Sequence, residues 1–247
     1  MRIPRIHVPG DYTPGQTLTL DDHQAHYLMR VLRLGEQHPI ELFNGQGLQA
    51  QALLAPVSKK RAQVVIDACE AISIESPLKT TLVQAVSKGD RMDYSLQKAV
   101  ELGVHAIVPV MTTHAMVRLN AQKAHKRQQQ WQSIVVHACE QSGRTWVPPV
   151  APIVSYDDWL AQTPTPLPGL VLNPTAETAL SQLAQHWTPP PQGLTFIIGP
   201  EGGLSAEEIA QAKAKGLKDI RLGPRVLRTE TAGVALLSAV QTLWGDQ

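Results

Sequence analysis

The pattern of apolar and polar residues changes once along the chain, near residue 70. Up to that point, short stretches of alternating apolar and polar residues are separated by turn residues, as in strands with one buried face. The stretch Asn44–Gly47 predicts a hairpin turn, and one helix is expected from about Asp22 to Leu34. The pattern therefore predicts a small β-barrel with one helix, whose strands are expected at 3–8, 17–20, 39–43, 48–54 and 62–66.

Beyond a short connection at 71–77, apolar runs alternate with amphipathic segments. Continuous apolar runs are typical of parallel strands that are covered on both faces. Strands are expected at 81–86, 106–111, 169–172, 194–198 and 219–222, and helices at 90–102, 120–141, 205–215 and 230–243. This order predicts an α/β domain with a mostly parallel sheet. We therefore divide the chain into domains at 1–72 and 73–247.

Composition narrows the class of protein. With 43% hydrophobic and 17% charged residues, the chain has enough apolar material for a core. The net charge of +1 means that any nucleic acid must be bound by local basic patches rather than by a global positive field. The two cysteines have no metal-binding or redox spacing, and His23 and His26 lack a third ligand, so we expect no metal site. No apolar run or leader suggests a membrane or secretion, so a cytoplasmic protein is expected.

Candidate chemistry begins at a glycine-rich stretch, Gly199–Gly203, between a predicted strand and a capped helix. Ligands of open α/β sheets bind beyond the carboxyl ends of the strands, so this loop is a candidate ligand site. The spacing matches neither the dinucleotide fingerprint nor the P-loop. A plain tight turn is the alternative.

A second strand-to-helix loop, Leu222–Ala232, carries arginines. Arg225 and Arg228, together with the preceding Arg221, give three arginines in eight residues. Such a cluster suits a site for an anion or RNA, although scattered surface charges are the alternative. The helix is expected to be capped by Thr229 or Thr231.

The two loops together resemble the RsmE family, the 16S ribosomal RNA uridine-N3 methyltransferases of the SPOUT superfamily. Further segments similar to that family occur along nearly the whole chain. They are Arg5–Ile6, His26–Arg33, Phe43–Gly45, Ser87–Asp93, Gln97–Val104 and Glu140–Arg144. The resemblance implies an N-terminal PUA-like β-barrel that binds RNA, a C-terminal SPOUT domain with a trefoil knot, and a homodimer.

The resemblance also implies S-adenosyl-L-methionine as the methyl donor, held by three loops. Leu222 and Leu227 are expected to pack against its adenine, with core packing as the alternative. The expected cofactor-binding residues are Leu172, Gly199, Pro200, Glu201, Gly202, Leu222, Gly223 and Leu227.

The reaction requires removal of the proton on uridine N3 and stabilisation of the charge that develops. Arg228 is the expected catalytic residue, because a fixed guanidinium suits that charge. Glu230 is the second, either as the proton acceptor or as a helix-stabilising carboxylate, and solvent is the alternative base. The substrate is expected to be 16S ribosomal RNA, free or within the small ribosomal subunit. Candidate RNA-binding residues are Arg2, Arg5, Arg30, Arg33, Arg118, Lys123 and Arg127, together with the neighbouring Lys126; solvated helix charges are the alternative for the cluster from Arg118 to Arg127.

Two rival functions follow from the same motifs. One is an RNA-binding or ribosome-assembly factor without activity, which the intact loops disfavour. The other is a SPOUT enzyme of different specificity, such as a ribose 2′-O-methyltransferase, which the β-rich start disfavours.

Overall fold

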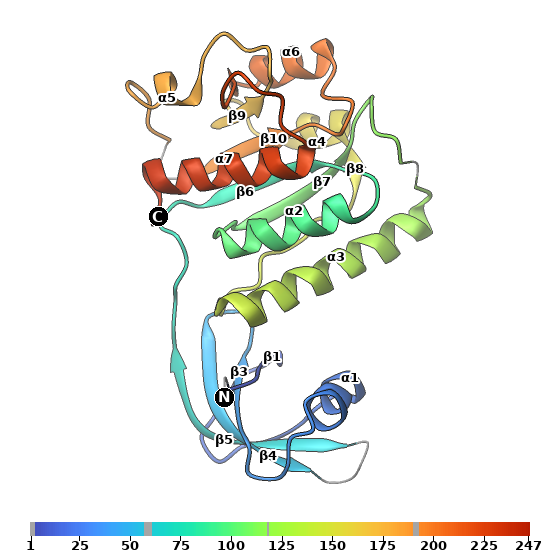
Figure 1. Ribbon diagram of the computed structural model, residues 1–247, viewed down its shortest axis with the longest axis vertical. Helices are drawn as coiled ribbons and strands as arrows, with labels where there is room; N and C mark the ends of the chain where they lie inside the picture. The colour runs from blue at the N-terminus through green and yellow to red at the C-terminus, as the bar shows by residue number, and fades with distance from the viewer. Residues whose placement is uncertain (1–2, 57–60, 118, 190–192) are drawn as a thin grey trace. The chain divides into compact units, whose positions relative to one another are not determined.

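The computed structural model describes residues 3–56, 61–117, 119–189 and 193–247. The chain folds into two compact units, each with its own sheet (Figure 1). The first unit contains Met1–Glu75 and Cys139–Val147, and the second contains Ser76–Ala138 and Pro148–Gln247. The division thus falls after residue 75 rather than 72, and the first unit includes a segment from the middle of the chain.

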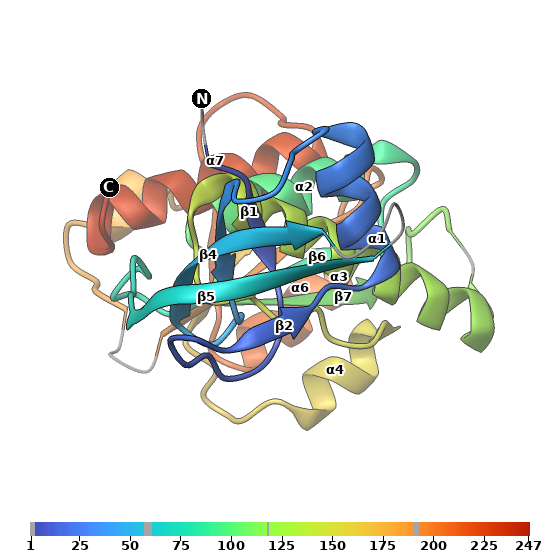
Figure 2. The ribbon, with the colours of Figure 1, turned by 90° about the horizontal axis from the view of Figure 1, so that it is seen from below.

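The first unit is built on a five-stranded sheet in the order β1-β3-β4-β5-β2. The strand β1 pairs parallel with β3, and the remaining neighbours are antiparallel. Figure 2 shows β4, β5 and β2 side by side. The apolar face of the sheet buries residues such as Ile40 of β3, Leu54 of β4 and Val64 of β5 in one core. The strands are β1 (Arg5–His7), β2 (Thr17–Thr19), β3 (Pro39–Phe43), β4 (Leu48–Pro56) and β5 (Ala62–Ala71).

The hairpin turn predicted in the first unit is present, and the predicted helix is present but shorter. The Asn44 side chain accepts hydrogen bonds from the backbone N–H of Gln46 and Leu48, which fixes the turn between β3 and β4. The helix is shorter than predicted, with α1 (Asp22–His26) continuing as a π-helical turn, η1 (Tyr27–Val31). Helical structure ends before Arg33, whose φ of 55° lies in the left-handed region.

The second unit confirms the predicted α/β class. Its sheet has the order β11-β9-β10-β6-β7-β8, and its paired neighbours are parallel. The strands are β6 (Thr80–Ala85), β7 (Ala106–Met111), β8 (Val154–Ser155), β9 (Gly169–Leu172), β10 (Leu194–Ile198) and β11 (Lys218–Ile220). The helices are α2 (Asp90–Glu101), α3 (Ala121–Ser142, whose last residues belong to the first unit), α4 (Tyr156–Gln162), α5 (Leu180–Leu183), α6 (Ala206–Ala214) and α7 (Thr229–Trp244).

Helices cover both faces of this parallel sheet. The helices α2 and α7 pack against each other on one face, and α4 and α6 pack on the other (Figure 1). On the α4 and α6 face, Val83, Val171 and Ile197 of the strands form a core with Tyr156 and Leu160 of α4. None of the helices in the described residues is long and apolar enough to cross a membrane.

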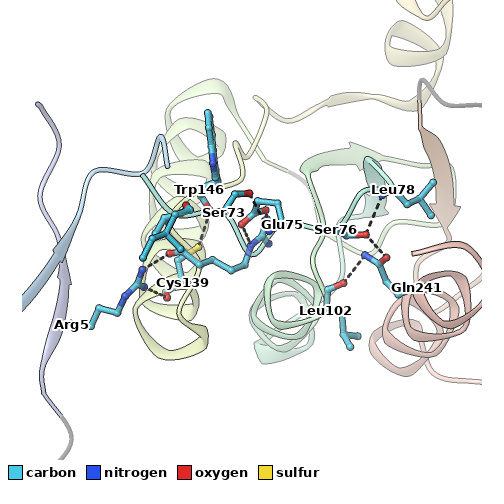
Figure 3. Close-up of polar contacts among 12 residues, drawn as sticks. Arg5, Ser73, Glu75, Ser76, Leu78, Leu102, Cys139, Trp146 and Gln241 are labelled. Carbon is cyan, nitrogen blue, oxygen red and sulfur yellow. Dashed lines mark hydrogen bonds and ion pairs between the residues drawn. The ribbon is translucent and has the colours of Figure 1, made fainter. Parts of the chain in front are cut away.

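The boundary between the units is marked by two adjacent residues with different partners (Figure 3). Within the first unit, the Glu75 carboxylate accepts a hydrogen bond from the Nε atom of Arg144 at 3.0 Å. Within the second unit, the Ser76 hydroxyl donates to Gln241 Oε1 at 2.7 Å. Arg5 donates to the carbonyls of Cys139 and Arg144 at 2.7 and 2.9 Å, which explains why the 139–147 segment belongs to the first unit.

Candidate active site

A cavity of about 460 Å³ opens at one edge of the parallel sheet of the second unit. The strands β11, β9 and β10 are neighbours in that sheet, so the loops after their carboxyl ends meet at the same edge. This is where ligands of open α/β sheets bind, and the volume is that of a small-molecule site. The lining residues come from these three loops, from the start of α7, and from Arg91 of α2, with Leu204 and Ile209 on the α6 side.

The loop after β10 is tightly folded. A Cβ atom on Gly199 would lie 2.9 Å from the backbone nitrogen of Leu204, so only glycine fits there without a shift of the loop. The Ser205 hydroxyl and the Glu208 carboxylate then form a capping box at the start of α6, which is the capped helix that the sequence predicted after this loop. Gly202 has a different environment, since a Cβ atom added there would lie 2.9 Å from His114 Cβ.

The structure therefore brings together most of the expected cofactor-binding residues. All of them except Gly202 line the cavity. The residues that line it are Leu172, Gly199, Pro200, Glu201, Leu222, Gly223 and Leu227. Both expected catalytic residues, Arg228 and Glu230, line it as well.

Thr229 connects the two glycine-containing loops. Its buried hydroxyl donates to the Gly199 carbonyl at 2.6 Å and accepts from Gln84 Nε2 at 3.0 Å. The prediction that Thr229 or Thr231 caps α7 is therefore wrong. The N-cap residue is Arg228, and its side chain forms no capping hydrogen bond with the described residues. Thr229 instead fixes the start of α7 against the loop after β10.

One side of the cavity is charged, and its charges come from three elements. Arg91 Nη1 of α2 lies 2.6 Å from Glu201 Oε1, which also accepts the backbone N–H of Lys88 at 3.0 Å. Burial alone would raise the pKa of Glu201. Hydrogen bonds from its own backbone N–H, from Lys88 and from Arg91 outweigh this effect of burial and hold that pKa below its ordinary value. Arg91 Nε also lies 3.9 Å from Glu230 Oε2 of α7.

The three arginines of the second loop have different environments. Arg225 and Arg228 are exposed and line the cavity. Arg221 donates from Nη1 to the carbonyl of Ala176 at 2.6 Å and also to that of Glu177, so its guanidinium is used within the fold. The predicted anion contact is thus left to Arg225 and Arg228.

The candidate RNA-binding residues are also not equivalent. Arg30, Arg33, Lys123, Lys126 and Arg127 are exposed. The side chain of Arg5 is 8% exposed, pairs with Glu41, and lies 4.1 Å from the centre of the Phe43 ring. With its donors also bound to two carbonyls, Arg5 is a structural residue of the first unit and is not open to an RNA phosphate. Arg2 and Arg118 lie outside the described residues.

Sequence reasoning missed several residues of the cavity. Arg91 and Asn173 line it and Thr229 joins its two loops, although none of these three was assigned to the site, whereas Arg225 was expected as an anion or RNA contact. Arg91 lies in one of the family-like segments, Ser87–Asp93, but no partner for it could be predicted from the chain. The described residues contain no group of three or more metal-ligating side chains.

Comparison with known proteins shows which family this chain belongs to. A model of the RNA methyltransferase domain matches residues 74–241, and a model of the RNA methyltransferase PUA domain matches residues 20–67. The ribosomal RNA small subunit methyltransferase E of Buchnera aphidicola, from the pea-aphid strain APS, is 32% identical, over 99% of this chain and 95% of its own. The chain belongs to the ribosomal RNA small subunit methyltransferase E family. Its α/β domain and its N-terminal PUA-like domain are those that the sequence predicted.

Solved structures agree with membership of the methyltransferase E family. A ribosomal RNA small subunit methyltransferase E from Neisseria gonorrhoeae, bound to S-adenosylmethionine, is 41% identical with a TM-score of 0.89, and 99% of each chain is covered. A Legionella pneumophila protein solved with bound S-adenosylmethionine is 38% identical with a TM-score of 0.93, and both chains are fully covered. The similarity therefore extends over both units of this chain.

Proposed function

We propose that this chain transfers a methyl group from S-adenosyl-L-methionine to N3 of a specific uridine in 16S ribosomal RNA of the small ribosomal subunit. The observation that carries the proposal is the cavity itself. It combines apolar walls and tight glycine backbone with an exposed arginine, Arg228, and a carboxylate, Glu230, at the start of one helix. Membership of the methyltransferase E family supports the ribosomal substrate.

The cavity fits S-adenosylmethionine in size and chemistry. Leu172, Leu222 and Leu227 offer apolar surface for the adenine ring. The absence of a side chain at Gly199, where a Cβ would meet the Leu204 backbone, keeps the loop tightly folded and leaves its backbone open to a ligand. When bound, the cofactor supplies an electrophilic methyl group. Alignment of that group with the acceptor nitrogen requires no covalent bond to the protein.

Arg228 and Glu230 suit the two needs of the acceptor base. Uridine N3 becomes a good nucleophile only when it loses its proton, and the resulting charge spreads over O2 and O4. Arg228 would stabilise this charge with a guanidinium that is already in place. Glu230 would accept the proton, because it lines the same cavity as Arg228 and a carboxylate can act as a general base.

RNA would be held by basic residues outside the cavity. In the first unit, Arg30 and Arg33 are exposed, and in the second, Lys123 and Arg127 on α3 are exposed. Phosphate contacts of this kind position RNA without reading its sequence. We further propose the cytoplasm as the location, a homodimer as the assembly and a trefoil knot in the C-terminal domain, all as the family resemblance implies.

Purified protein offers the direct biochemical test. The protein would be incubated with methyl-labelled S-adenosylmethionine and either free 16S ribosomal RNA or small subunits that lack the modification. Nucleoside mass spectrometry then identifies the product. We expect 3-methyluridine at one position. Methylation of a ribose 2′-oxygen would show a different specificity, and cofactor binding without transfer to either substrate would favour a binding factor.

A further inference from the structure

Among the described residues, Arg91 is the cavity residue that α2 contributes, and it lies between two carboxylates of other elements. Its Nη1 atom is 2.6 Å from Glu201 in the loop after β10, and its Nε atom is 3.9 Å from Glu230 in the first turn of α7. The planar guanidinium directs its N–H groups along fixed directions, so one arginine can address two carboxylates at once. A lysine, with a single ammonium group, could not maintain both contacts with the same geometry.

The two contacts differ in kind. Glu201 accepts hydrogen bonds from Arg91 in the first turn of α2 and from the Lys88 N–H just before that helix, so this carboxylate fastens the loop after β10 to the start of α2. A carboxylate is also favoured at a helix N-terminus. Glu230 is close enough to Arg91 for attraction, yet its Oε2 atom is buried and accepts no hydrogen bond from the described residues. Attraction to Arg91 therefore offsets part of the cost of burying this carboxylate oxygen.

We propose that Arg91 is a positioning residue for both halves of the site. Through Glu201 it holds the cofactor-binding loop in place, and through Glu230 it orients the carboxylate that receives the uridine proton. This inference rests on the proposed function, because the second role requires Glu230 to act on a bound base. Neither role requires Arg91 to contact the methyl group or the base.

Two double-mutant cycles test this role. The single change Arg91→Met, which keeps an unbranched chain without charge, should raise the dissociation constant for S-adenosylmethionine by about tenfold or more, since it removes a charge-assisted hydrogen bond. It should also lower kcat for methylation. If Arg91 acts through its partners, Glu201→Gln with Arg91→Met should bind cofactor within about twofold of the weaker single variant. Likewise, Glu230→Gln with Arg91→Met should have a kcat within about twofold of the slower single variant.

Independent effects of Arg91 and its partners would give a different result in the double variants. If the fold-changes of the single variants multiply in both double variants, Arg91 acts independently of its partners and the inference is overturned. The control is Lys98→Met on the same helix, where Lys98 pairs with Glu101 at 2.8 Å and does not line the cavity. This variant should leave the dissociation constant and kcat unchanged. If Arg91→Met unfolds at the assay temperature, Arg91→Gln, which is also uncharged, replaces it in both cycles.

The same measurements separate this inference from the proposed function. Wild-type protein that forms no 3-methyluridine contradicts the proposed function. Wild-type protein that forms it, combined with multiplying effects in the cycles, contradicts only the role of Arg91.

Discussion

Replacing Gly199 with alanine is the smallest change that should disturb the cofactor site. The added Cβ would lie 2.9 Å from Leu204 N, 3.1 Å from Leu204 Cγ and 3.2 Å from Gly203 C. Two of these three atoms are backbone, which cannot rotate away as a flexible side chain would. The loop must therefore move as a unit, and with it the wall of the cavity between Gly199 and Leu204.

The magnitude follows from the cost of overpacking. Inserting a methyl group into a closely packed position typically costs about 1–3 kcal/mol. The loop lies at a cavity rather than in a core, so we expect it to relieve this cost by moving away from its cofactor-binding shape. Applied to the binding equilibrium, about 1–3 kcal/mol raises a dissociation constant by roughly 5- to 150-fold.

Isothermal titration calorimetry with S-adenosylmethionine measures this effect directly, and thermal unfolding without cofactor measures stability. The matched control is Gly35→Ala in the first unit, where an added Cβ meets no atom within 4 Å. The control should bind cofactor as the wild type does. An unchanged dissociation constant for Gly199→Ala, with or without a loss of thermal stability, would show that this loop is not part of the cofactor-binding wall.

Three further predictions concern other parts of the site. Arg228→Ala should bind cofactor normally but lose about 10²- to 10³-fold in kcat, as for other preorganised donors to a developing negative charge, and normal turnover would remove Arg228 from catalysis. Thr229→Val should lower the free energy of unfolding by about 1–3 kcal/mol in urea titrations, because the Gly199 carbonyl and the buried Gln84 amide lose their shared partner; an unchanged midpoint would argue against this role. The pKa of Glu201 is lower in the folded protein than its ordinary 4.5, so its stabilising effect should be complete above that pH and disappear as pH falls through the folded value. The melting temperatures of wild type and Glu201→Gln should therefore differ at about pH 7 and converge as the pH falls below the folded-state pKa of Glu201, whereas a constant gap would contradict the assignment.

The sequence was most informative where local pattern alone decides structure. The strands β3, β7, β9 and β10 begin and end at the predicted residues, because each is a short apolar run with turn residues beside it. The short elements β8, α4 and α5 were not predicted. The helix α4 offers only Tyr156 and Leu160 as buried residues one turn apart, which is too little for a helical periodicity to stand out.

The cavity was predictable only in part, for a related reason. Its loops are contiguous in sequence and contain glycine, so they could be assigned from the chain. The contacts that shape the site join distant residues, such as Arg91 with Glu201 and Gln84 with Thr229, which are 110 and 145 positions apart. Parallel-sheet order decides such contacts, and no local pattern encodes it. In the same way, nothing local distinguishes Arg5, which is buried in the first unit, from the exposed Arg30.

The proposed formation of 3-methyluridine in 16S ribosomal RNA can be examined in cells. Nucleoside mass spectrometry would compare 16S ribosomal RNA from a strain with the gene, a strain without it, and a deletion strain that expresses either wild-type protein or the Arg228→Ala variant. We predict that 3-methyluridine disappears on deletion, returns with wild-type protein and does not return to its full level with the variant. Unchanged 3-methyluridine in the deletion strain would show that another enzyme makes this modification.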